Sequence, residues 1–200
     1  SLKALQMVTD QTLVVVVDTH RPDSTMQPKI LDKCKEVCVI DHHRKGAHFI
    51  NNPIFQYHEP QSSSASELVT ELIFYQTTKV NVSEQVANFL LSGICLDTKF
   101  FKSGVSGKTF EMAMNLKNYQ ASVEAVNEYF KEEYEEMKLI SGIVNSAKVL
   151  SPGIFMATSD EEDIITRTAL SKAAEEILST KGVQAVFVVG GTNNSEVSIS

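Results

Sequence analysis

The sequence lacks several features that would point to particular classes of protein. It holds no tryptophan and only three cysteines among 200 residues, and an odd cysteine count argues against a disulfide framework and for reduced thiols. The longest apolar run, within residues 13–17, is far too short to cross a bilayer, and the first residues lack the cationic start and apolar segment of a signal peptide. We therefore expect a cytoplasmic domain that makes no direct contact with a membrane.

Basic residues are also scarce relative to acidic ones. The chain has 18 lysines and arginines against 25 aspartates and glutamates, for a net charge of −7. This balance excludes a basic field that would gather long nucleic acid by counterion release, although local cations could still hold a small anion. An apolar content of 42% and a charged content of 22% are those of an ordinary globular chain, with one large domain or two small ones.

The most informative stretch is Val37–Arg44, which reads VCVIDHHR. Its apolar, β-branched run ends abruptly in an acid, two imidazoles and a guanidinium, a pattern typical of a buried strand that stops at the mouth of a cleft. A carboxylate and two imidazoles are poor core material, because each needs a hydrogen-bond partner or a metal once it is desolvated. The stretch therefore indicates a functional site.

Two other apolar runs also end in acids. The stretch Thr12–His20 (TLVVVVDTH) carries Asp18, and the stretch Leu90–Phe101 (LLSGICLDTKFF) carries Asp97. Because the carboxyl ends of neighbouring parallel strands face one crevice, we expect these acids to meet His42 there.

Carboxylate oxygens from Asp18 and Asp97, combined with the imidazole of His42, suit Mn²⁺, with Mg²⁺, Co²⁺ or Zn²⁺ as alternatives. Metal sites that share an acid in this way favour the hydrolysis of phosphate esters. His43 and Arg44, next to the metal ligand, would then bind phosphate oxygens and offset charge that develops in the transition state.

The remaining pattern predicts the surrounding elements. Serines 62–64 are expected to cap a helix with apolar residues at 65, 68, 69, 72 and 73, or alternatively to contact a ligand. One long helix is expected over 123–148 as a connector between two domains. Beyond it we expect strands at 148–150, 154–158, 184–189 and 197–200, a helix over 161–178, and turns at Gly190-Gly191 and Asn193-Asn194.

Four stretches together resemble the DHH phosphoesterase superfamily: VVVVDTH, VIDHHR with the following Asn51-Asn52-Pro53, the SSSASELVTEL helix, and SGICLDTKFF. They are most similar to the catalytic module of the membrane-tethered bacterial cyclic di-AMP phosphodiesterases. The resemblance implies an α/β fold with a parallel-sheet DHH domain carrying helices on both faces (1–121). It further implies a connector helix (122–146) and the beginning of a smaller mixed α/β DHHA1 domain (147–200).

The resemblance also implies roles for individual residues. Asp18 would bridge two Mn²⁺ ions in the complete enzyme, His42 and Asp97 would be ligands of the second ion, and His43 would contact phosphate. Asp41 would orient the histidines. A motif of one histidine and two aspartates is expected before residue 1 and a GGGH motif after residue 200. The chain is thus expected to be an internal piece of a membrane-anchored enzyme, with weak metal binding and little turnover alone.

The activity implied is the hydrolysis of cyclic di-AMP, a cyclic dinucleotide, to linear pApA. Arg44 stands where oligonucleotide-trimming relatives tend to have proline, which favours the cyclic dinucleotide as substrate. The alternatives are a nanoRNase or pApA phosphodiesterase, a manganese pyrophosphatase, and a non-catalytic binding or dimerisation module. The acidic connector and the apolar faces also permit a homodimer.

Overall fold

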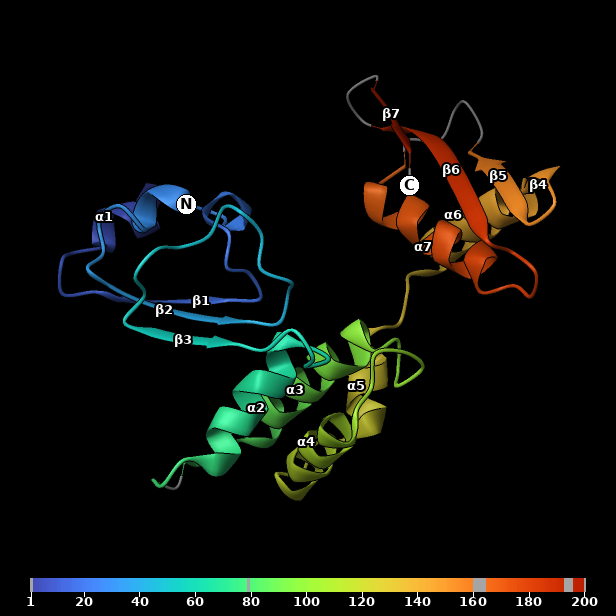
Figure 1. Ribbon diagram of the computed structural model, residues 1–200. Helices are drawn as coiled ribbons and strands as arrows, with labels where there is room; N and C mark the ends of the chain where they lie inside the picture. Colours follow the sequence, from blue (N-terminus) through green and yellow to red (C-terminus); the bar gives the residue numbers. More distant parts are fainter. Residues whose placement is uncertain (1, 79, 160–164, 193–195, 200) are drawn as a thin grey trace. The chain divides into compact units, whose positions relative to one another are not determined.

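The chain divides into two compact units, residues 1–130 and 131–200, which are coloured blue to green and yellow to red in Figure 1. The computed structural model describes residues 2–78, 80–159, 165–192 and 196–199. Each unit combines helices with a sheet of its own. The α/β class predicted from the sequence is therefore confirmed.

The first unit contains a parallel sheet with the strand order β1-β2-β3. Its strands are β1 (Leu13–Val17), β2 (Glu36–Asp41) and β3 (Phe55–His58), and a short helix, α1 (Leu2–Met7), precedes them. The strands run in the same direction, so their carboxyl ends lie at one edge of the sheet. Asp41 is in register with His58 at that edge, which places the DHHR sequence beside the end of the neighbouring strand.

The two β-branched strands differ in burial. Val37, Val39 and Ile40 of β2 are buried, as expected for a central strand of a parallel sheet. Alternate residues of β1, by contrast, are about half exposed: Leu13, Val15 and Val17. The apolar run of β1 therefore covers a core on one face only.

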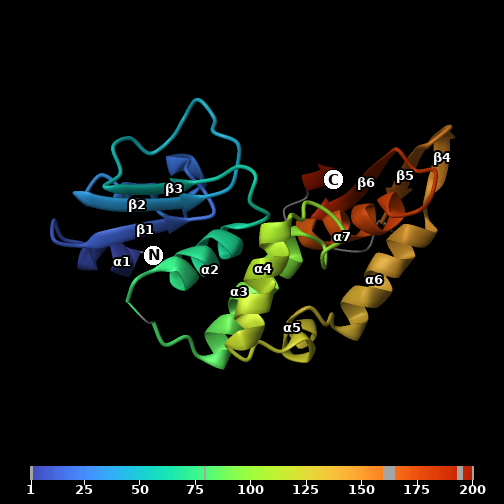
Figure 2. The same ribbon diagram turned by 60° about the horizontal axis from the view of Figure 1, so that its bottom comes forward.

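Four helices complete the first unit. They are α2 (Ala65–Tyr75), α3 (Glu84–Asp97), α4 (Gly107–Asn118) and α5 (Val123–Tyr129). A serine caps each of them by accepting a hydrogen bond from a backbone N–H of the first turn: Ser64, Ser83, Ser106 and Ser122. Helix α2 contacts β2, and α3 packs against α2, α4 and α5. Figure 2 shows α2 alongside the sheet and α3 beside α4.

The described residues of the second unit form a four-stranded mixed sheet and two helices. Its elements are α6 (Tyr134–Asn145), β4 (Lys148–Ser151), β5 (Ile154–Thr158), α7 (Arg167–Leu178), β6 (Ala185–Thr192) and β7 (Glu196–Ile199). The strand order is β4-β5-β6-β7, with β5 and β6 parallel and the outer pairs antiparallel. Helices α6 and α7 cover β5 and β6 and form a separate core with them.

The single helix predicted over 123–148 is wrong, because α5 and α6 are separate helices that belong to different units. The apolar stripe is continuous in sequence, but its two halves are buried in different cores. Val126 and Phe130 pack with α3 and α4, whereas Ile140 and Ile143 pack with α7. The helix is interrupted between these two sets of contacts, after α5 and before α6.

The turn predicted at Gly190-Gly191 is also wrong, because both residues lie within β6. A Cβ atom at Gly190 would lie only 2.7 Å from Leu170 Cδ2 and 3.0 Å from Ser159 Oγ. This glycine therefore allows a close approach between β6 and α7. The turn predicted at Asn193-Asn194, and residues 161–164 of the predicted helix, lie outside the described residues.

Across the described stretches, no helix combines the length and apolar character that a bilayer crossing requires.

Candidate metal centre

Asp18 is the first residue after β1, and its backbone is fixed by the sheet. The Asp18 N–H donates to the carbonyl oxygen of Ile40 at 2.9 Å, which extends the pairing of β1 with β2 by one residue. The φ angle of Asp18 is +63°, in the left-handed region that aspartate tolerates better than most residues. The chain thus turns sharply here, and the carboxylate is left exposed at the edge of the sheet.

Asp97 also lies close to His42, but a helix rather than a strand carries it. It was predicted to follow a strand, but it is the last residue of α3. Apolar runs of this length fit either a strand or a buried helix, and here the residues on one side of the run, Leu91, Ile94 and Cys95, are buried against α4 and α5. The side chain of Asp97 is one third exposed.

The structure brings the three predicted ligands together. His42 Nε2 lies 3.4 Å from an oxygen of Asp18 and 3.6 Å from an oxygen of Asp97. Ligands bound about 2.1 Å from a common ion lie no more than about 4.2 Å apart, and both separations meet this limit. Carboxylate oxygens and an imidazole nitrogen are donors that suit a divalent cation. The described residues whose ligand atoms all lie within 4.8 Å of one another here are Asp18, His42 and His43, so Asp97 pairs with His42 but is not part of that group.

The orientation of His42 is set from its other ring nitrogen. His42 Nδ1 lies 3.3 Å from the carbonyl oxygen of Ser62; because a carbonyl only accepts, Nδ1 carries the proton and Nε2 keeps its lone pair. The turn that holds this carbonyl is itself tied to α2, since the N–H and hydroxyl of Ser63 donate to the buried Glu67 carboxylate. The serine cluster therefore caps α2, as predicted, and also orients His42.

Asp41 lies beneath the site and is fully buried. One of its oxygens accepts from the His43 N–H at 3.2 Å and from His43 Nδ1 at 2.7 Å. The other oxygen bonds His20 Nδ1. Burial raises the pKa of Asp41, but the hydrogen bonds from His43 and His20 outweigh burial and lower it overall. The geometry therefore keeps Asp41 ionised between the two rings.

His43 is the exposed partner of this pair. The hydrogen bond with Asp41 raises the pKa of His43; burial opposes the shift, and the charges of Asp41, Asp18 and Asp97 add to it. The side chain is 57% exposed, and its ligand atom lies within 4.8 Å of those of Asp18 and His42. A protonated imidazole at this position can donate to an anion bound at the edge of the sheet.

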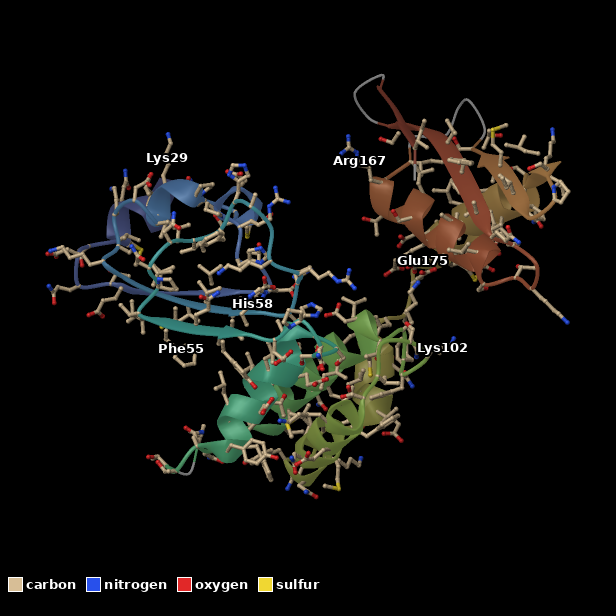
Figure 3. All side chains as sticks on the ribbon, viewed as in Figure 1. Lys29, Phe55, His58, Lys102, Arg167 and Glu175 are labelled. Atoms are coloured by element: carbon tan, nitrogen blue, oxygen red, sulfur yellow. The ribbon has the colours of Figure 1, made fainter. Side chains whose placement is uncertain are left out.

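A second cluster, His20, Asp41 and His58, also has the spacing of a metal site. Its atoms, however, are already engaged in hydrogen bonds. His20 Nε2 accepts from the Gly46 N–H at 3.0 Å, and His58 Nε2 bonds the carbonyl oxygen of His43. His58 stands at the end of β3 (Figure 3). This cluster is a hydrogen-bond network rather than a metal site. The sequence predicts that Asp41 orients the histidines, but it predicts no role for His20 or His58, although His20 ends the stretch TLVVVVDTH.

The chain leaves α3 through an unusual turn. Lys99, Phe100 and Phe101 all have positive φ angles, between 50° and 62°. The buried Thr98 holds this turn: its hydroxyl donates to the carbonyl of Ile94 at 2.6 Å and accepts from the Phe101 N–H at 3.0 Å. Asp97 therefore sits directly before a tightly bonded left-handed turn.

A pocket of about 270 Å³ opens beside the two acids. It lies between the end of β1 and helices α2 and α3, and its other walls are mostly apolar. The lining residues are Val17, Asp18, Ala65, Ser66, Val69, Leu90, Gly93, Leu96 and Asp97. Asp18 and Asp97 thus stand at the rim of this pocket. Arg44, on the loop after His43, is exposed.

The interaction of His43 with Asp41 predicts a pH dependence of stability. The pKa of His43 is raised on folding. The interaction therefore contributes fully to the free energy of unfolding below the ordinary histidine pKa of about 6.5, and this contribution is lost as the pH rises through the pKa of His43 in the folded protein. We expect urea unfolding in EDTA to show wild type more stable than His43→Ala by at most about 1 kcal/mol at pH 5.5, given the exposure of the ring.

That difference should shrink above neutral pH. Asp18, Asp97 and His42 are the other titratable groups close to the ring, so each should be present unchanged in both proteins. A difference that grew between pH 6 and pH 8 would contradict the assignment.

Comparisons with known proteins agree with this fold. Residues 2–94 match the family described as "DHH family, N-terminal domain". A solved structure of an exopolyphosphatase-related protein from Bacteroides fragilis superposes with a TM-score of 0.86 at 16% identity, over 99% of this chain and 60% of that one. The predicted fold class is thereby confirmed.

The relatives found by sequence comparison carry names that state a more specific activity. The chain is 36% identical over 198 residues to the cyclic-di-AMP phosphodiesterase GdpP of Geobacillus thermodenitrificans and 37% identical over 186 residues to the cyclic-di-AMP phosphodiesterase PdeA of Listeria monocytogenes. These matches cover 99% and 93% of this chain but only 30% and 28% of the relatives. A more distant relative, 29% identical over 84% of the chain and 30% of its own length, is a probable manganese-dependent inorganic pyrophosphatase of Thermotoga maritima.

Proposed function

We propose that this chain is the metal-binding part of a phosphodiesterase that hydrolyses cyclic di-AMP to linear pApA. The observation that carries the proposal is that Asp18 and Asp97 each place a carboxylate oxygen within 3.6 Å of His42 Nε2, in a chain that matches cyclic-di-AMP phosphodiesterases over nearly its whole length. Because the chain spans about 30% of those relatives, the activity belongs to the full-length protein.

Asp18, His42 and Asp97 would hold the divalent cation. We propose Mn²⁺, with two ions in the complete enzyme and Asp18 as the acid shared between them. Oxygen and imidazole ligands in combination suit Mn²⁺ well. When bound, such a cation polarises a phosphoryl oxygen and stabilises the charge of the transition state.

The remaining residues act on the substrate. Protonated His43, held by Asp41 through Nδ1, would donate from its other nitrogen to a non-bridging phosphate oxygen. Arg44, on the exposed loop that follows, would form a bidentate contact with a phosphate. The positive charges of His43 and Arg44 would stabilise the phosphoryl oxygens more strongly as negative charge develops on them during hydrolysis.

A comparison of substrates tests the proposal. With Mn²⁺ present, the full-length protein is expected to hydrolyse cyclic di-AMP faster than pApA or pyrophosphate, while residues 1–200 alone should show little turnover. Product analysis by ion-exchange chromatography would identify pApA. Fastest cleavage of pyrophosphate would instead favour the activity that the Thermotoga relative's name states, and robust turnover by residues 1–200 would show that the ligands are misassigned.

We also propose that the second unit, residues 131–200, is part of a DHHA1 domain, that the full-length protein is anchored in a membrane, and that it forms a homodimer. The mixed sheet and separate core of the second unit support the first of these assignments.

A further inference from the structure

His20 occupies an unusual position for a histidine that is not a metal ligand. Its side chain is 2% exposed, and both ring nitrogens are engaged. Nδ1 bonds the carboxylate of Asp41, and Nε2 lies 3.0 Å from the backbone nitrogen of Gly46. A backbone N–H can only donate, so Nε2 accepts and Nδ1 carries the proton. The structure thereby fixes the tautomer of His20.

The two partners of His20 lie at opposite ends of one loop. Asp41 is the last residue of β2, and Gly46 lies five positions later. His43 and Arg44 stand between them, as does His42. His20 itself is tied to the segment that leads into β3, because its carbonyl accepts from the Ile50 N–H at 2.8 Å. One buried ring therefore braces both ends of the loop that carries the proposed phosphate contacts.

Each contact of His20 has a separate consequence. The bond to Asp41 stops that carboxylate from rotating and so fixes the oxygen that accepts from His43. The bond to Gly46 fixes the backbone two residues after Arg44. His58, whose ring centroid lies 5.1 Å from that of His20, supports the same loop through the carbonyl of His43. His20 and His58 thus hold the loop in position through Asp41, Gly46 and the carbonyl of His43.

We propose that His20 is a positioning residue for His43 and Arg44, acting through Asp41 and Gly46. The inference rests on the proposed function, because it concerns residues that would bind the substrate phosphate. Groups of this kind, which orient others without touching the substrate, typically change activity by about 10–100-fold when they are removed.

Two conservative substitutions separate the two contacts. The side-chain amide of asparagine stands near the position of Nδ1, so His20→Asn keeps a donor for Asp41 and loses the acceptor for Gly46. Glutamine reaches the position of Nε2, so His20→Gln keeps the acceptor for Gly46 and loses the donor for Asp41. His20→Ala loses both. The exposed His48 of the same loop region provides a matched control, His48→Ala.

In the full-length protein, His20→Ala is expected to lower kcat/KM for cyclic di-AMP by about 10–100-fold. His20→Asn should recover most of kcat and show a raised KM, since His43 stays oriented while the Arg44 loop loosens. His20→Gln should show the reverse, and His48→Ala should match wild type. A folded His20→Ala protein with wild-type kcat/KM would overturn the proposal, as would equal defects in both parameters for all three variants.

Nuclear magnetic resonance gives a readout that does not depend on activity. In long-range ¹H–¹⁵N spectra of residues 1–200, wild-type His20 should show a protonated Nδ1 and an unprotonated Nε2. In His20→Ala, the His43 ring should lose the Nδ1-protonated signature that its bond to Asp41 imposes. A wild-type His20 protonated at Nε2 would overturn the proposal. Should the full-length protein fail to cleave cyclic di-AMP, the proposed function would fall while these spectra would still test His20.

Discussion

Replacement of Asp97 by asparagine is expected to remove most of the proposed divalent-metal binding and to lower the proposed hydrolysis of cyclic di-AMP by the full-length protein by at least about a thousandfold. A bound cation contributes several kcal/mol to stabilising transition-state charge, and about 1.4 kcal/mol corresponds to a factor of ten in rate. The amide of asparagine has the same shape as the carboxylate but carries no charge. The shape of the site, with His42 Nε2 3.6 Å away, should therefore persist while its affinity is lost.

Metal stoichiometry and turnover should be measured together on the same full-length preparations. Asp23→Asn is the matched control, because Asp23 is exposed in a short 3₁₀ turn, belongs to neither group of described residues with the spacing of a metal site and undergoes the same chemical change. It should bind Mn²⁺ and hydrolyse cyclic di-AMP as wild type does. Full metal content in the Asp97→Asn protein would show that this residue is not a ligand.

Replacement of Gly93 by alanine is expected to cost about 1–3 kcal/mol in the free energy of unfolding. Gly93 lies where α3 crosses α2, and a Cβ atom there would stand 2.1 Å from Ser66 Oγ and 2.9 Å from Ser66 Cβ. The hydroxyl could rotate away, but the Cβ of Ser66 is fixed to the α2 backbone, so the two helices would have to separate. Urea unfolding followed by circular dichroism measures the loss.

A compensating exchange sharpens this test. The double variant Ser66→Gly/Gly93→Ala moves the small residue to the other helix and should recover part of the stability. Gly107→Ala is the control, since no atom lies within 4 Å of a Cβ at that helical position; it should leave stability nearly unchanged or raise it slightly. Gly93→Ala with wild-type stability would mean that α2 and α3 do not approach so closely.

The same substitution should also affect the site. Helix α3 ends in Asp97, and α2 begins beside the Ser62 carbonyl that orients His42. If the helices separate, the two ligands move apart. We therefore expect metal affinity to fall in Gly93→Ala even under conditions where the protein remains folded.

The sequence predicts the parts of this structure that depend on local signals. Runs of β-branched residues mark β1 and β2, and a serine cap marks the start of α2. The convergence of Asp18 with His42 follows from a general property of parallel sheets, namely that strand ends meet at one edge. These features need no knowledge of distant contacts.

Features that depend on long-range packing cannot be predicted from local sequence signals. The run LLSGICLD fits a strand or a helix, and only its burial against α4 and α5 makes it helical. The break between α5 and α6 has no proline or glycine to mark it, because it arises where the chain passes from one core to another. The role of His20 is invisible for a similar reason, since Gly46 is 26 positions away.

The left-handed turn after α3 affects the affinity of the proposed metal centre for its ion. The final turn of a helix usually frays, and a ligand placed there would have to be ordered each time an ion arrived. Here Thr98 and the turn at residues 99–101 close the helix end. The conformational entropy of the carboxylate-bearing backbone is therefore lost once, when the polypeptide folds, and does not subtract from the affinity of each binding event.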